Sequence, residues 1–187
     1  MPYNTNVIKN NKDKVIELEI DIGLRNDMVR TTRDRIIDNL EATKRFLDLI
    51  EERYDHICAG LFTYAVEEYG KILFLTSLSP SSPNNKIKVP YTHKNQGFLD
   101  HEHKFNLALN DKDLPSSCKV LFEGGFTDTG FTKTGFTHDT LPNFDARMSV
   151  FYTDFDKENG YNSILIPPLT KRDLLVKAVG DFLEFIL

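Results

Sequence analysis

The chain has no tryptophan, only two cysteines and no apolar run long enough to cross a membrane. A membrane-spanning helix needs about 20 consecutive apolar residues, so we expect no membrane segment. The polar N-terminal residues also lack the apolar core of a secretory signal peptide. Two cysteines are too few for the disulfide framework that holds small secreted domains together. We therefore expect reduced thiols and a cytoplasmic protein.

A strong excess of either charge is absent as well. The chain has 23 basic and 28 acidic side chains, a net charge of −5. This balance disfavours a broad nucleic-acid-binding surface but leaves room for a small basic pocket. A chain of 187 residues can bury a hydrophobic core without disulfide or metal support. We expect a single domain over residues 1–187, with no metal or other cofactor.

The most informative segment is a helix, residues 59–75, that is apolar almost all the way round. This pattern is typical of a central helix rather than a surface helix. Two adjacent carboxylates, Glu67 and Glu68, interrupt it, and a buried charge without a partner costs several kcal/mol. Lys71 has the helical spacing to pair with either glutamate. The sequence therefore predicts a helical fold with a polar cluster inside or beside its core.

Hydrophobic periodicity and turn signals place the remaining elements. The expected elements are a half-buried strand at 14–24, a helical hairpin at 31–78, a loop at 79–97, a helix at 98–110, a β-hairpin at 148–166 and a helix at 170–187. Residues 123–140 contain Gly-Phe-Thr three times. We expect a mobile loop there, or an arm that contacts a partner subunit. The predicted fold class is mainly α: a bundle of about four to five helices, with a small antiparallel sheet formed by the N-terminal strand and the C-terminal hairpin.

Residues able to carry acid–base chemistry occur in three separate segments. In a catalytic interpretation, His101 is a general acid or base and Glu68 holds it in place. Lys104 and Arg147 then neutralise a phosphate group, since arginine binds phosphate with two parallel hydrogen bonds. This chemistry requires that the side chains of the three segments meet in space.

A structural interpretation uses the same side chains as a buried ion-pair network, with His101 as a hydrogen-bond partner. The acids are then Glu67 and Glu68, and the cations are Lys71, Lys104 and Arg147. A metal site would need both glutamates together with His101 and His103. On the helical wheel, however, His103 points away from the buried stripe of its helix, and we expect no metal site.

Three motifs in this order resemble the abortive-infection AbiV family of the HEPN superfamily. They are Y-A-x-E-E-x-G-K at residues 64–71, D-H-x-x-K at residues 100–104, and Arg147 followed by Tyr152 and Asp154 before a hairpin and two prolines. The resemblance covers the chain from about residue 30 to its C-terminus. It implies an HEPN-like helical bundle, often a homodimer, and a role in antiviral or stress defence. Within these motifs the candidate binding residues are Glu67, Lys71, Tyr152 and Asp154.

The resemblance leaves two functions open. The first is a protein-interaction module of a phage-defence or stress-response system, acting as a homodimer or on a protein partner. The alternative is a metal-independent ribonuclease that uses His101 and Arg147. Many members of the superfamily are such ribonucleases and carry an arginine four to six residues before a histidine. No arginine and histidine have that spacing in this chain.

Overall fold

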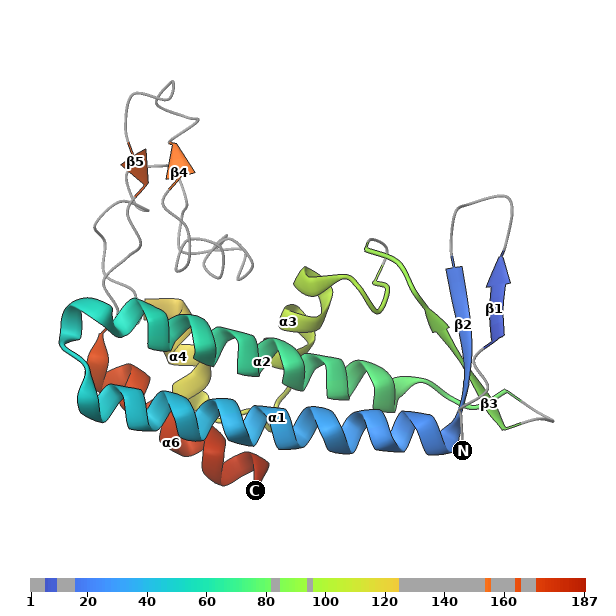
Figure 1. Cartoon of the computed structure of the whole chain (residues 1–187), viewed down its shortest axis with the longest axis horizontal. Helices are drawn as coiled ribbons and strands as arrows, with labels where there is room; N and C mark the ends of the chain where they lie inside the picture. Colours follow the sequence, from blue (N-terminus) through green and yellow to red (C-terminus); the bar gives the residue numbers. More distant parts are fainter. Residues whose placement is uncertain are drawn as a thin grey trace. The chain divides into compact units, whose positions relative to one another are not determined.

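A computed structural model describes residues 6–9, 16–81, 85–93, 96–124, 154–155, 164–165 and 171–187. Figure 1 shows the elements in chain order. The strands are β1 (Asn6–Lys9), β2 (Ile16–Asp21), β3 (Lys86–Pro90), β4 (Asp154–Phe155) and β5 (Ile164–Leu165). The helices are α1 (Ile22–Leu49), the short 3-10 turn η1 (Glu52–Tyr54), α2 (Asp55–Ser77), α3 (His101–Asn110), α4 (Ser116–Gly124) and α6 (Arg172–Ile186). The prediction of a mainly helical fold with a small antiparallel sheet is confirmed.

The long helices lie where the sequence predicts them, but α1 begins at a different residue from the one predicted. Helices α1 and α2 follow one another with only residues 50–54 between them, as the helical hairpin requires. Helix α1 begins at Ile22, earlier than predicted, because the Asp21 carboxylate accepts a hydrogen bond from the Leu24 N–H at 2.7 Å. Such a carboxylate satisfies an N–H group that has no partner within the helix. The predicted strand at 14–24 therefore ends at Asp21.

The strand arrangement differs from the prediction. Strand β2 pairs with β1 on one side and with β3 on the other, both antiparallel, while β4 and β5 pair with each other. Strand β3 lies inside the segment 79–97, which we expected to be a loop. Among the described strands, β2 therefore has its partners in β1 and in β3, which lies between α2 and α3, and not in β4 or β5. Of that hairpin, predicted at 148–166, the structure describes only β4 and β5.

Three further helices and one loop complete the comparison. The helix predicted at 98–110 begins at His101, and helix α4, which was not predicted, follows Pro115. The helix predicted at 170–187 is confirmed as α6. Most of the Gly-Phe-Thr segment, 125–140, lies outside the described residues. No helix in the described part of the chain is long and apolar enough to cross a membrane.

The chain divides into two compact units, and α1 and α2 each run through both. Unit 1 comprises Met1–Ile36 and Val66–Asn110, and unit 2 comprises Ile37–Ala65 and Asp111–Leu187. We describe each unit by itself. The single domain over residues 1–187 stays a prediction.

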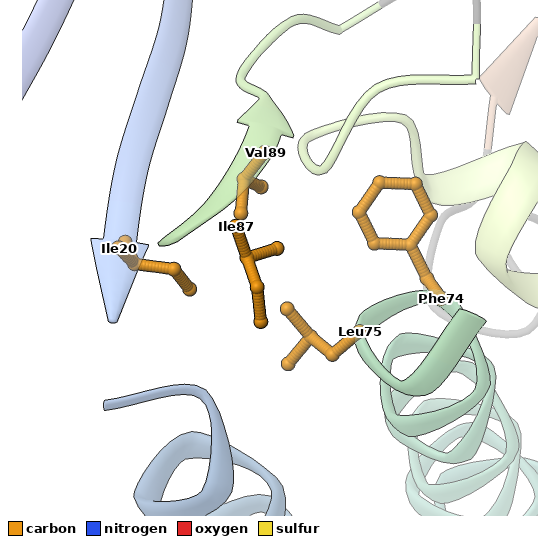
Figure 2. Close-up of a cluster of buried hydrophobic side chains, with 5 residues drawn as sticks. All are labelled: Ile20, Phe74, Leu75, Ile87 and Val89. Atoms are coloured by element: carbon orange, nitrogen blue, oxygen red, sulfur yellow. The ribbon is translucent and has the colours of Figure 1, made fainter. Parts of the chain in front are cut away.

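Unit 1 has its core where the sheet meets the last turns of α2. Figure 2 shows Ile20 of β2 with Ile87 and Val89 of β3, facing Phe74 and Leu75 of α2. Ile20 lies directly opposite Ile87 in the strand register. Side chains of a strand alternate between its two faces, so this register buries one face of the sheet. On the other face, Lys86–Glu19 and Lys88–Glu17 ion pairs link the two strands at 3.6 and 3.8 Å.

Unit 2 has an aromatic core and a buried ion pair. The ring of Phe62 on α2 lies 6.0 Å from Phe122 of α4 and 6.0 Å from Phe182 of α6. Asp55, at the start of α2, is buried and pairs with Arg172 at 2.7 Å. The same guanidinium donates to the backbone carbonyls of residues 47 and 50. Arg172 therefore fastens the start of α6 to the connection between α1 and α2.

Candidate functional site

The polar cluster lies in unit 1, where α2 and α3 meet. Both glutamates of the Glu-Glu-x-Gly-Lys motif are buried: Glu67 is 1% exposed and Glu68 is 4% exposed. Their carboxylates must be matched by nearby cations or hydrogen-bond donors, since burial removes the water that would solvate them. The two glutamates find different partners.

Glu67 is met by two side chains from α3. Its Oε1 forms a close contact with Nδ1 of His101, and Nζ of Lys104 lies 3.7 Å from the same oxygen. The side chain of His101 is 44% exposed, whereas that of Glu67 is 1% exposed. A buried carboxylate therefore holds one nitrogen of an imidazole ring that reaches the surface. This is the arrangement by which a carboxylate fixes the tautomer and orientation of a catalytic histidine.

Glu68 is met within its own helix. The Lys71 ammonium donates to both carboxylate oxygens, at 3.2 Å to Oε1 and 3.0 Å to Oε2. This pair was one of the two that the helical spacing allowed. Because Lys71 is mostly buried, the pair loses little to solvent screening compared with an exposed ion pair.

Gly70 explains how α3 comes so close to Glu67. A Cβ atom added to Gly70 would lie 1.7 Å from the backbone oxygen of Lys104. No other residue fits at this distance, so the glycine of the motif lets the two helix backbones approach each other directly. The close approach places His101 and Lys104 over the side of α2 that carries Glu67.

Asp100 fixes the start of α3. Its Oδ1 accepts a hydrogen bond from the His103 N–H at 3.0 Å, and its Oδ2 accepts one from the Gln96 N–H at 3.2 Å. Asp100 is thus the N-cap of α3, with a carboxylate placed favourably at the positive end of the helix dipole. In the D-H-x-x-K motif, the aspartate orients the helix while the histidine and the lysine reach Glu67.

Phe98, just before α3, contacts both lysines of the cluster. The ammonium groups of Lys71 and Lys104 are each 5.6 Å from the centre of its ring. Tyr91 stacks on the same ring at 5.9 Å. Cation–π contacts of this kind hold an ammonium in place more strongly when water is excluded. No pattern in the sequence indicated this role of Phe98.

Lys104 is buried, and burial lowers the pKa of its ammonium, an effect that the nearby Glu67 carboxylate opposes. Its Nζ lies inside the cluster, where it balances Glu67. This agrees with the structural interpretation, in which Lys104 is one of the cations that compensate the two glutamates. Its role at a phosphate group stays a prediction.

Two expectations about orientation are wrong. Glu67, and not Glu68, holds His101, because α3 packs against the side of α2 on which residues 67, 70 and 74 lie. His103 does not point away from the core, since its ring packs edge-on against Phe74 at 6.1 Å. The first error arises because a helical wheel by itself does not show which side of α2 contacts α3.

The remaining site residues belong to the third segment. Arg147 and Tyr152 lie outside the described residues, and Asp154 is described only as the first residue of β4. Their predicted roles stay predictions. Among the described residues, no group of three or more histidine, cysteine, aspartate or glutamate side chains is arranged to hold a metal ion.

Comparison of the chain with models of protein families, with curated proteins and with solved structures found no significant match.

Proposed function

We propose that the protein is an RNA-directed acid–base catalyst of the HEPN/AbiV type, in which His101 transfers the proton. One observation carries the proposal: a half-exposed imidazole has its Nδ1 held by the buried carboxylate of Glu67. Glu67 orients the ring, and Nε2 is then the nitrogen available to a substrate. The order of the three sequence motifs supports the same family.

RNA suits a site of this kind because its 2′-hydroxyl is an internal nucleophile. His101 Nε2 accepts the proton of that hydroxyl, whose oxygen attacks the adjacent phosphorus. The bond to the 5′ oxygen breaks, and the leaving oxygen takes a proton from solvent. The products are a 2′,3′-cyclic phosphate and a 5′-hydroxyl end. Arg147, as the predicted phosphate ligand, would stabilise the charge that develops on the phosphoryl oxygens.

Cleavage of a labelled single-stranded RNA in the presence of EDTA tests the proposal. We expect His101→Ala to reduce the rate by at least about 100-fold, the usual contribution of a general base. His93→Ala is the matched control, because His93 is an exposed histidine in the loop before α3. A rate that is equal in all three proteins would reveal a contaminating nuclease and overturn the proposal.

The Glu67→Gln variant tests whether Glu67 orients His101, without disturbing the fold. The amide keeps the size of the side chain but changes the group that faces Nδ1. We expect the rate to fall while the circular dichroism spectrum stays unchanged. A full rate in Glu67→Gln would show that the Glu67–His101 contact is only structural.

A second function is supported by the surface of unit 2. Every large apolar side chain that the structure describes as exposed belongs to that unit: Phe46, Leu49, Tyr54, Ile57, Tyr64, Val120, Val176, Phe185 and Leu187. Exposed apolar side chains are available to pack against a protein partner. This supports a protein-interaction module of a phage-defence or stress-response system, which acts as a homodimer or on a protein partner.

The His101→Ala variant distinguishes the two functions in cells. In a bacterial host challenged with phage, a catalyst loses protection when His101 is replaced, whereas an interaction module retains it. The readout is the plating efficiency of phage on hosts that express the two proteins at equal levels.

A further inference from the structure

Helix α6 has a second apolar stripe besides the one that it buries. Its inner face is buried in unit 2 through Leu175, Ala178, Val179, Phe182 and Ile186. The second stripe consists of Val176, Gly180, Leu183 and Leu187, which we call the α6 stripe. Val176 is 50% exposed and Leu187 is 70% exposed, and Gly180 and Leu183 lie between them, partly exposed.

The spacing of the α6 stripe is that of a helix-pairing surface. Its members are separated by four, three and four residues, the spacing at which side chains form the seam between two packed helices. To pack within unit 2, α6 needs only the one apolar face that it buries. With respect to the described part of the chain, the α6 stripe is therefore available for a second helix.

Gly180 supports a close approach at the middle of this stripe. A Cβ atom at this position would meet nothing within 4 Å, so packing within the chain does not require a glycine. A glycine in a helix interior costs about 1 kcal/mol relative to alanine. Gly70 shows what such a residue does elsewhere in this chain, where it lets another helix backbone come near. At Gly180 no backbone in the described part of the chain makes such an approach, which leaves room for one from a second chain.

Charges beside the stripe indicate which helix this is. Lys177 and Glu184 are both exposed and lie on the same flank of the α6 stripe. In an antiparallel pair of helices, equivalent flanks face each other across the seam. A two-fold axis between Gly180 and Leu183 would bring Lys177 of each copy beside Glu184 of the other. In a parallel pair, equivalent flanks lie on opposite sides of the seam, so Lys177 would not meet Glu184 of the other copy.

We propose that the α6 stripe docks against the same stripe of a second copy of this chain, antiparallel and about a two-fold axis. Two-fold contacts of this kind use one self-complementary patch twice. The inference rests on the self-association included in the proposed function and adds its surface. It is independent of the chemistry proposed at His101.

Charge reversal tests the arrangement by sedimentation equilibrium of the full chain. We expect Lys177→Glu and Glu184→Lys each to weaken self-association by about tenfold or more, because each places two like charges at both ends of the seam. The double variant should restore it, and so should an equimolar mixture of the two single variants. Gly180→Leu should abolish it by keeping the backbones apart.

Asp181→Asn is the matched control. Lys177 forms an ion pair with Asp181 at 2.8 Å within α6, and Lys177→Glu removes that pair too. Asp181→Asn removes it without reversing a charge beside the stripe, so self-association should persist. Thermal unfolding followed by circular dichroism verifies that each variant remains folded.

The outcomes separate the two proposals. A wild-type protein that is monomeric at all concentrations overturns both self-association and this interface. A dimer that is unaffected by Gly180→Leu and by both reversals keeps self-association and overturns the interface. A double variant that stays as weak as the single variants overturns the antiparallel arrangement, and with it the inference.

Discussion

Burial determines the chemistry of single ionisable side chains in this protein. Burial raises the pKa of Asp55, and the neighbouring Arg172 guanidinium opposes this effect. Burial lowers the pKa of Lys104, because the removal of water disfavours its positive charge. Each buried charge has a partner of opposite sign within its own unit. His101 differs from them because its ring is only half buried while its partner Glu67 is fully buried.

The two thiols give a prediction at this scale. Burial raises the pKa of Cys58 from 9.0 to about 11 and that of Cys118 from 9.0 to about 12. Only the thiolate reacts with disulfide reagents, so both cysteines of the native protein should react at least about 100-fold more slowly than free cysteine at pH 8. Ellman's reagent measures this, with the guanidinium-unfolded chain as the control. Rapid labelling of the native protein would contradict it.

The same shift predicts a pH dependence of stability. Above pH 9.0 the unfolded chain gives up its thiol protons, while the folded chain keeps them until about pH 11 at Cys58. The folded state then binds more protons than the unfolded state, so the free energy of unfolding falls as the pH rises through this window. Cys58→Ala should flatten this part of the curve, as measured by urea unfolding at several pH values.

At the scale of elements, two glycines in helices have opposite consequences. Gly70 of α2 touches the backbone of α3, whereas Gly180 of α6 has open space around it. Helical propensity favours alanine over glycine at both positions. The neighbouring backbone therefore decides whether replacing each glycine by alanine raises or lowers the free energy of unfolding.

We expect Gly70→Ala to lower the free energy of unfolding by about 2–3 kcal/mol or more, because the methyl group forces α3 away from α2. Gly180→Ala should raise it by about 0.5–1 kcal/mol. Urea unfolding of dilute protein measures both changes. Gly70→Ala should also slow RNA cleavage, because His101 moves with α3. Equal stability of the two variants would contradict the close contact at Gly70.

At the scale of the whole molecule, the net charge of −5 determines the long-range electrostatic interaction of the protein with a polyanion such as RNA. Most RNA-binding proteins use many lysine and arginine contacts and lose affinity steeply as salt rises. Here the mean field of the protein repels RNA, and salt screens that repulsion. The polar cluster itself contains two glutamates and two lysines, which balance each other.

If the protein cleaves RNA as proposed, its kcat/KM should stay level or rise between about 50 and 200 mM salt, the range over which basic proteins lose affinity. Initial rates on a labelled RNA at subsaturating concentration measure this. A tenfold fall over that range would indicate a basic surface contributed by residues outside the described part of the chain.

The sequence was sufficient wherever local periodicity decided the structure. The apolar pattern of residues 59–75 predicted α2 and the burial of its glutamates, and the pattern of the last residues predicted α6. The sequence also singled out Glu67, Glu68, Lys71, His101 and Lys104 as members of one cluster, together with Arg147, which lies outside the described residues. Strand β3 and helix α4 were missed because each is short, and β3 lies in a segment rich in proline and asparagine.

What only the tertiary structure decided is which side of each helix meets which neighbour. Neighbouring residues on a helix point about 100° apart, so the choice between Glu67 and Glu68 as the partner of His101 depended on where α3 packs. That position follows from the backbone contact at Gly70, which joins residues 34 positions apart. The pairing of β2 with β3 depended in the same way on residues distant in sequence. Local patterns determine the elements of this protein, and long-range contacts between backbones determine its site.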